Sequence, residues 1–137
     1  MWTRFPFKWN DKTQKQVKEL IEDEPITIVY GGTTRNDSLK KALRTINSEK
    51  IIVHDAARPH IIVDDITKML KALDEYDIAT YYHKVVDTIK DGIKTLNRNN
   101  LKAVTTPQGF KKELVDKILN NQEDVFDELQ IFENDNI

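Results

Sequence analysis

Apolar residues occur along this chain in two patterns, short continuous runs and stripes with helical spacing. Runs rich in β-branched residues cover residues 26–30, 51–54 and 78–82, and such runs are typical of strands buried on both faces. Apolar residues three or four positions apart cover residues 39–46 and 63–76, which predicts amphipathic helices. Because strands and helices alternate, the pattern predicts an α/β fold, a three-layer αβα sandwich around a mostly parallel sheet, with residues 26–30 and 51–54 as central strands.

The same pattern continues towards both ends of the chain. A further amphipathic helix is expected over residues 10–23, and Pro25 would end it. Towards the C-terminus we expect a strand over residues 101–106 that Pro107 ends, followed by a helix over residues 110–119.

A hairpin pattern interrupts this alternation. Residues 84–90 and 93–96 predict two extended segments, and Asp91–Gly92 is typical of a tight two-residue turn. A two-stranded ribbon is marginally stable by itself, because its apolar side chains need a surface to pack against. We therefore expect an antiparallel β-arm over about residues 84–98 that projects from the domain and packs on a second subunit, as a homodimer.

Length and charge narrow the class of protein. A chain of 137 residues is long enough for one core, so we expect a single domain over residues 1–137. Lys and Arg total 21 against 23 Asp and Glu, a formal net charge of −2, which argues against nucleic acid or a membrane as partner. Cysteine is absent, so disulfides and thiolate metal sites are excluded. With neither an apolar leader nor an apolar run of membrane-spanning length in this sequence, we expect a cytoplasmic protein.

The strand over residues 51–54 leads into the first candidate site. His54 and Asp55 stand at its carboxyl end, where open α/β sheets bind ligands, and Arg58 follows before a proline. The alternative is that Asp55 and Arg58 only pair with each other. The three histidines of the chain lack zinc-ligand spacing, and His54 is expected to be structural.

A glycine turn supplies the second candidate site. Gly31 and Gly32 directly follow the strand over residues 26–30 and precede a predicted helix. Glycines allow close backbone approach, and the free N–H groups of a first helical turn attract anions or hydroxyls, so a phosphate or ribose site is expected here. The alternative for Asp37 and Ser38 is that they only cap the helix.

Five local patterns then occur in one order: GGTTRNDS at residues 31–38, HDAARP at 54–59, DTIK at 87–90, NRNNL at 97–101 and TPQGF at 106–110. Together they resemble the 2-C-methyl-D-erythritol 4-phosphate cytidylyltransferase family of isoprenoid synthesis. This resemblance implies a nucleotidyltransferase fold, a homodimer interlocked through the arm, and transfer of a cytidylyl group from CTP with release of pyrophosphate. It also implies Mg²⁺ as the cofactor that bridges the phosphates.

The resemblance implies a role for each motif residue. It assigns nucleotide contacts to Gly31, Gly32, Arg35 and Ser38, catalysis to Asp55 and Arg58 with Asp55 also as the metal ligand, and acceptor binding to Thr88, Arg98 and Thr106. Thr88 and Arg98 would act from the neighbouring subunit. Without the resemblance they would be an ordinary strand residue and an ordinary turn cation.

The resemblance begins at about Trp9, and three family features have no counterpart here: the glycine-rich triphosphate loop with its arginine, the lysine that follows it, and a lysine after the final residues. Two explanations are open, a part of a longer protein or a truncated and inactive product. Two other functions are also open. Ribitol-5-phosphate cytidylyltransferase shares the fold, the arm and a TPQ segment, and a non-catalytic dimerisation or nucleotide-binding remnant would explain the missing loop.

Overall fold

The computed structural model describes residues 2–3, 19, 26–122 and 128–133. The chain divides into two compact units, a first unit made of Met1–Asn47 with Val115–Ile137 and a second unit made of Ser48–Leu114. The expected helix over residues 10–23 lies outside the described residues, apart from Glu19, which is helical. No helix in the described part of the chain is long and apolar enough to cross a membrane.

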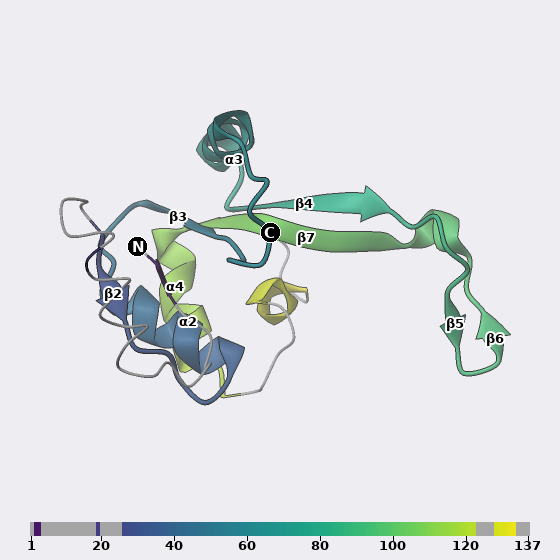
Figure 1. The fold of residues 1–137 in the computed structure, drawn as a ribbon, viewed down its shortest axis with the longest axis horizontal. Coiled ribbons are helices and arrows are strands. Elements are labelled where there is room, and N and C mark those ends of the chain that lie inside the picture. Colours follow the sequence, from purple (N-terminus) through teal and green to yellow (C-terminus); the bar gives the residue numbers. More distant parts are fainter. Residues whose placement is uncertain (1, 4–18, 20–25, 123–127, 134–137) are drawn as a thin grey trace. The chain divides into compact units, whose positions relative to one another are not determined.

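In the described part of the first unit, two α-helices pack beside a short parallel strand pair (Figure 1). Its elements are β1 (Trp2–Thr3), β2 (Ile28–Val29), α2 (Arg35–Leu43), α4 (Val115–Asn120) and the 3-10 helix η3 (Glu128–Phe132). The helical spacing seen in the sequence is confirmed, because Leu39, Ala42 and Leu43 of α2 are buried. Ile118 of α4 and Phe132 of η3 are buried as well, and α4 contacts both α2 and η3.

The second unit is built on a three-stranded sheet. Its elements are β3 (Lys50–Val53), α3 (Val63–Glu75), β4 (Ile78–Lys84), β5 (Lys90–Asp91), β6 (Lys94–Thr95), η1 (Arg98–Asn100), β7 (Lys102–Lys111) and η2 (Lys112–Leu114). The strand order is β3-β7-β4, and β7 runs antiparallel to both neighbours. β3 and β4 therefore point the same way, as expected for two strands joined by a crossover helix.

The α/β class is thus confirmed. Among the described pairs, β1 with β2 is parallel, whereas both pairs made by β7 are antiparallel. Among the described residues the three-stranded sheet has β7 at its centre, and β3 forms one of its two edge strands.

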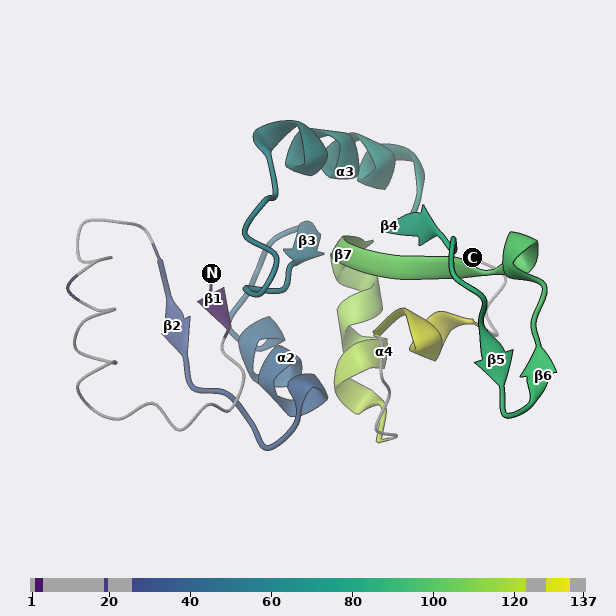
Figure 2. The same ribbon diagram turned by 45° about the vertical axis from the view of Figure 1, so that its right-hand side comes forward.

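The core of the second unit lies between α3 and the sheet (Figure 2). Met69 and Leu73 of α3 are buried against β7, where Phe110 is 1% exposed. Gly109 permits this close packing, because a Cβ there would lie 2.8 Å from Cδ1 of Leu73 and 3.0 Å from Sδ of Met69. The hydroxyl of Tyr81 donates to the carbonyl of Asp65 at 3.1 Å, and burial raises the pKa of Tyr81, so this donor stays protonated at neutral pH.

One expectation for the C-terminal half is wrong: Pro107 does not end the strand. β7 continues to Lys111, and the predicted helix over residues 110–119 shortens to η2 followed by α4. The pairing with β4 explains this. Tyr81 pairs with Thr105 and Thr80 with Gln108, so Thr106 and Pro107 form an irregularity where no N–H is needed from the proline.

The arm is also arranged differently from the expectation. Among the described pairs, β3 reaches only Gln108–Lys111 of β7. Beyond it, Tyr81–Lys84 of β4 and Lys102–Thr105 of β7 pair as a two-stranded ribbon, which continues into the β5–β6 hairpin (Figure 1). Asp91 pairs with Lys94, which makes Gly92 and Ile93 the turn residues in place of Asp91 and Gly92. Gly92 has a φ of 60°, a value that favours glycine at the first position of such a turn.

Replacement of a buried residue of α3 tests this packing. Leu73 is 0% exposed, so Leu73→Ala is expected to lower the free energy of unfolding by about 2–5 kcal/mol, because it leaves a cavity above Gly109. Leu70→Ala is the matched control, since Leu70 lies on the same helix and is 39% exposed. Its free energy of unfolding should fall clearly less than that of Leu73→Ala. Urea unfolding of both variants measures the difference, and equal losses would contradict the packing.

Candidate functional site

The glycine turn forms a closed hydrogen-bonded loop before α2. The Gly32 N–H donates to Oγ of Ser38 at 2.9 Å, and the Ser38 hydroxyl donates to the Thr34 carbonyl at 2.9 Å. Thr34 is the N-cap, and its side chain accepts from the N–H of Asp37 while the Asp37 carboxylate accepts from the N–H of Thr34. Thr34 thus caps the helix, in place of Asp37 or Ser38, and Asp37 completes a capping box.

Gly32 is required by this close approach. A Cβ at Gly32 would lie 2.2 Å from Cβ of Asp37 and 2.9 Å from its carbonyl carbon, which no side chain could tolerate without moving the loop. Ser38 is 4% exposed, so its observed contacts shape the loop from inside. Arg35 is the first residue of α2, directly behind the loop. The predicted nucleotide contacts of this loop remain predictions.

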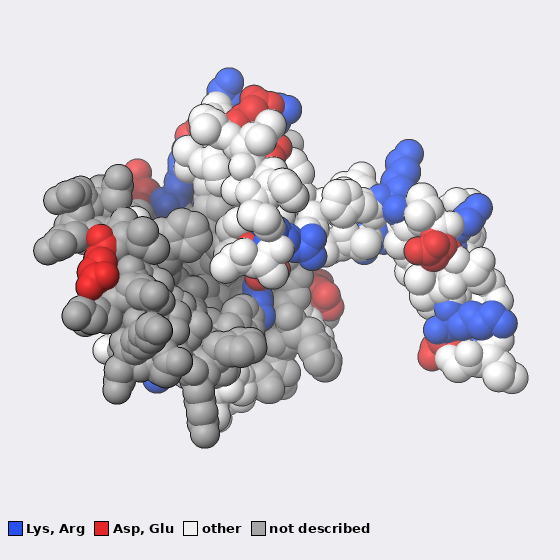
Figure 3. Space-filling view, in the orientation of Figure 1, with Lys and Arg blue, Asp and Glu red and all other residues white. Residues whose placement is uncertain are grey.

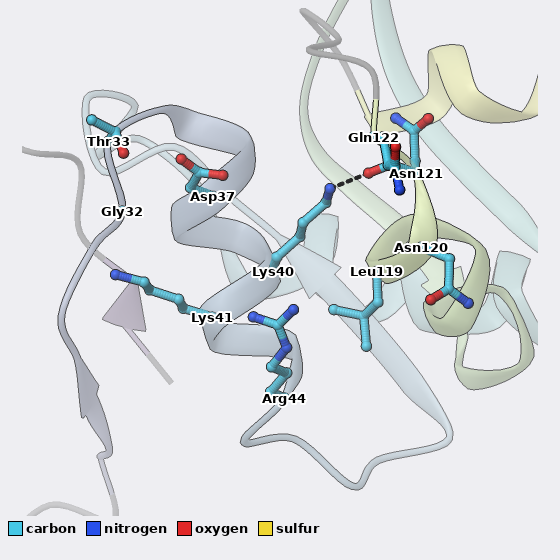
Figure 4. Close-up of a pocket in the computed structure, with 10 residues that line it drawn as sticks. All are labelled: Gly32, Thr33, Asp37, Lys40, Lys41, Arg44, Leu119, Asn120, Asn121 and Gln122. Carbon is cyan, nitrogen blue, oxygen red and sulfur yellow. Dashed lines mark hydrogen bonds between the residues drawn. The ribbon is translucent and has the colours of Figure 1, made fainter.

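A basic cavity of about 500 Å³ opens beside the same loop (Figure 4). Lys40, Lys41 and Arg44 line it from α2 and its C-cap, and Asn120, Asn121 and Gln122 line it from the end of α4. Lys40 donates to the carbonyl of Asn121, and Lys41 donates to the Gly31 carbonyl at 3.1 Å. The sequence analysis did not identify these cations as candidates. The sequence feature that could have identified them is the group of basic residues shortly after the glycine loop, Lys40, Lys41 and Arg44.

The second candidate site lies where β3 ends. The N–H of Asp55 donates to Oγ1 of Thr106 at 3.2 Å, and Nε of Arg58 lies 3.5 Å from Oδ2 of Asp55. The N–H of Arg58 donates to the carbonyl of Asp55 at 2.9 Å, which closes a turn over residues 55–58. The structure therefore brings three predicted site residues together, although Thr106 is 51 positions from Asp55 in the sequence.

The pairing of Asp55 with Arg58 was the simple alternative for these residues, and the pair does form. The two side chains nevertheless remain 31% and 50% exposed, so a ligand can reach both of them. An ion pair with this exposure contributes little to stability, about 0–1 kcal/mol. The ion pair therefore does not prevent Asp55 and Arg58 from binding a ligand.

Thr88 and Arg98 lie on the arm, outside this cluster. Arg98 belongs to η1, beyond the outer end of β7, and its Nη1 donates to the carbonyl of Val86 at 2.6 Å. Thr88 is exposed just before β5. Neither residue has a described contact with Asp55, Arg58 or Thr106 in the same chain, and their predicted roles remain predictions.

Comparison with known proteins identifies the family. The family model of IspD, 2-C-methyl-D-erythritol 4-phosphate cytidylyltransferase, matches residues 7–134. This chain belongs to that family. A 2-C-methyl-D-erythritol 4-phosphate cytidylyltransferase of Bacillus thuringiensis is 33% identical over 116 residues, which cover 77% of this chain and 51% of the relative. The bifunctional enzyme IspD/IspF of Pelagibacter ubique is 32% identical over 130 residues, 89% of this chain and 35% of that enzyme.

Solved structures agree with this assignment. The 4-diphosphocytidyl-2C-methyl-D-erythritol synthase of Anaerococcus prevotii superposes with a TM-score of 0.78 at 31% identity, over 90% of this chain and 60% of that chain. The bifunctional IspDF of Campylobacter jejuni gives a TM-score of 0.72 at 30% identity, over 85% of this chain and 32% of that chain. The family and the fold are therefore established, and this chain spans about half the length of the Bacillus relative.

The hydrogen bonds of Ser38 can be tested without any ligand. Ser38→Ala leaves the partly buried Gly32 N–H without its acceptor, so it should cost about 1 kcal/mol of unfolding free energy and speed hydrogen exchange at Gly32. Ser48→Ala is the control, because Ser48 is exposed. Unchanged exchange at Gly32 in Ser38→Ala would contradict the loop geometry.

Proposed function

We propose that this chain forms the nucleotide loop and the acceptor site of an enzyme that transfers a cytidylyl group from CTP to 2-C-methyl-D-erythritol 4-phosphate. The observation that carries the proposal is the cluster of Asp55, Arg58 and Thr106, because it joins the HDAARP and TPQGF motifs of the family in one place. The names of the matching relatives support the methylerythritol acceptor over ribitol 5-phosphate.

In the proposed reaction an oxygen of the acceptor phosphate attacks the α-phosphorus of CTP, and pyrophosphate leaves. Catalysis of this kind depends on holding the two phosphates in line and neutralising their charge. The exposed guanidinium of Arg58 would bind phosphate oxygens and orient the acceptor. Thr106 would hold the backbone of Asp55 in place from β7, as its hydroxyl does in the structure.

Asp55 also suits the Mg²⁺ that this chemistry employs, which would neutralise charge on the reacting phosphates. Mg²⁺ in nucleotide enzymes is held by one or two carboxylates together with phosphate oxygens and water. Asp55 offers one partly exposed carboxylate at the end of β3. In the described part of the chain no group of three or more His, Cys, Asp or Glu side chains could hold a metal ion.

We further propose that the protein is a homodimer whose arms cross. Ile93 is 97% exposed and Val86 is 76% exposed, and burial of each such side chain in a partner contributes roughly 1.5–3 kcal/mol. In the part of the second unit visible in Figure 3, basic and acidic side chains are interspersed. Thr88 and Arg98 of one subunit would then complete the acceptor site of the other.

The direct test is CTP-dependent release of pyrophosphate by the protein that carries this chain, with each acceptor supplied separately. Release with methylerythritol phosphate is expected, and Asp55→Asn should lower kcat by about a hundredfold because it removes a charge partner of the transition state. Asp77→Asn is the control, since Asp77 pairs with Lys111, which lies beside Lys50 at the other end of β3 from Asp55. Release with ribitol 5-phosphate alone would identify the rival enzyme, and release with neither acceptor would favour the non-catalytic remnant.

The crossed arms can be tested with mixed dimers that carry Asp55→Asn in one subunit and Arg98→Ala in the other. If Arg98 serves the partner's site, both defects fall in one site and the second site remains intact, so about half of the wild-type activity returns. Homodimers of either variant provide the baseline. A mixed dimer no more active than these homodimers would contradict the crossed arrangement.

A further inference from the structure

His54 closes the turn that carries Asp55 and Arg58. Its Nε2 lies 2.7 Å from the carbonyl oxygen of Arg58, four residues further along the chain. A carbonyl oxygen can only accept a hydrogen bond, so the hydrogen must reside on Nε2. A ring with its hydrogen on Nδ1 alone would instead point a lone pair at the Arg58 oxygen.

The other ring nitrogen supports the same tautomer. Nδ1 of His54 is buried and has no hydrogen-bond partner in the described part of the chain. A hydrogen there would be a buried donor without an acceptor, which costs free energy. In the described part of the chain the ring therefore makes one hydrogen bond, to the carbonyl of Arg58.

Three hydrogen bonds then define the turn from its first residue to its last. The N–H of Asp55 is held by Thr106 of β7, and the N–H of Arg58 is held by the carbonyl of Asp55. The carbonyl of Arg58 is held by His54, and Pro59 after it has no N–H to add a further bond. The bond from His54 thus sets the direction in which the chain leaves Arg58.

We propose that His54 is a positioning residue: its Nε2–H tautomer holds the Arg58 carbonyl and keeps the Arg58 guanidinium beside the Asp55 carboxylate, facing the acceptor phosphate. This role rests on the proposed function for its catalytic consequence, but the tautomer and the turn can be measured without activity. Replacement of His54 by glutamine or by asparagine distinguishes this hydrogen-bonding role from a role in packing alone. Glutamine places an amide N–H the same number of bonds from Cα as Nε2, whereas asparagine is one bond too short.

The first measurement is nitrogen NMR of the His54 ring, combined with hydrogen exchange at the Arg58 amide, in wild type, His54→Gln and His54→Asn. We expect a hydrogen on Nε2 in the wild type, a protected Arg58 amide in wild type and His54→Gln, and faster exchange in His54→Asn. His83→Asn is the matched control, because His83 is exposed on β4. A hydrogen on Nδ1 alone in the wild type would overturn the proposal, and this result does not depend on whether any variant folds. Equal exchange at the Arg58 amide in wild type, His54→Gln and His54→Asn would overturn it as well.

The second measurement is steady-state kinetics with the acceptor. Misplacement of a positioned group by about 1 Å can cost on the order of a hundredfold, so His54→Asn should lose on the order of tenfold or more in kcat/KM for the acceptor while KM for CTP stays constant. His54→Gln should recover most of that loss. Equal losses in both variants would overturn the positioning role. If wild type itself lacks activity, the proposed function fails, and NMR and exchange still decide whether His54 holds the turn.

Discussion

The backbone hydrogen bonds of β7 hold the second unit together on both sides. β7 pairs with β3 through Gln108–Lys111 and with β4 along most of its length, so the edge strand, the arm and the helix above the sheet all depend on it. The irregularity at Thr106 and Pro107 lies where β3 ends and the turn over residues 55–58 begins. Thr106 lies at this irregularity, beside the end of β3, and its hydroxyl accepts the N–H of Asp55. The site cluster is therefore a consequence of strand pairing.

The glycine loop before α2 is held in shape by hydrogen bonds among its own residues. Its hydrogen bonds run among Gly32, Thr34, Asp37 and Ser38, and none of them requires a ligand. A loop already folded in this way loses little conformational entropy when a ligand binds. Reactions at phosphate depend on positioning more than on covalent chemistry by the protein, so rigid loops of this kind suit the cytidylyl transfer proposed here.

Local sequence patterns predicted those elements that depend on local interactions. The helices over Arg35–Leu43 and Val63–Glu75 followed from apolar spacing, and the family followed from five short motifs. The extension of β7 past Pro107 was missed, because the pairing that tolerates the proline is made with β4, far away in the sequence. Thr34 was missed as the cap although the signal is local: Thr34 and Asp37 have the three-residue spacing of a capping box, and the structure shows that box formed. The contact of His54 with Arg58 requires the three-dimensional turn.

The central claim is that the two motif clusters bind the two substrates, Gly32–Ser38 the nucleotide and Asp55–Arg58 with Thr106 the acceptor. An NMR titration of amide shifts tests it most directly, with CTP and 2-C-methyl-D-erythritol 4-phosphate added separately in the presence of Mg²⁺. The account predicts saturable shifts at Gly32 and its neighbours with CTP, and at Asp55, Arg58 and Thr106 with the acceptor. Saturable shifts confined to other residues, or no saturable shifts with either substrate, would contradict it.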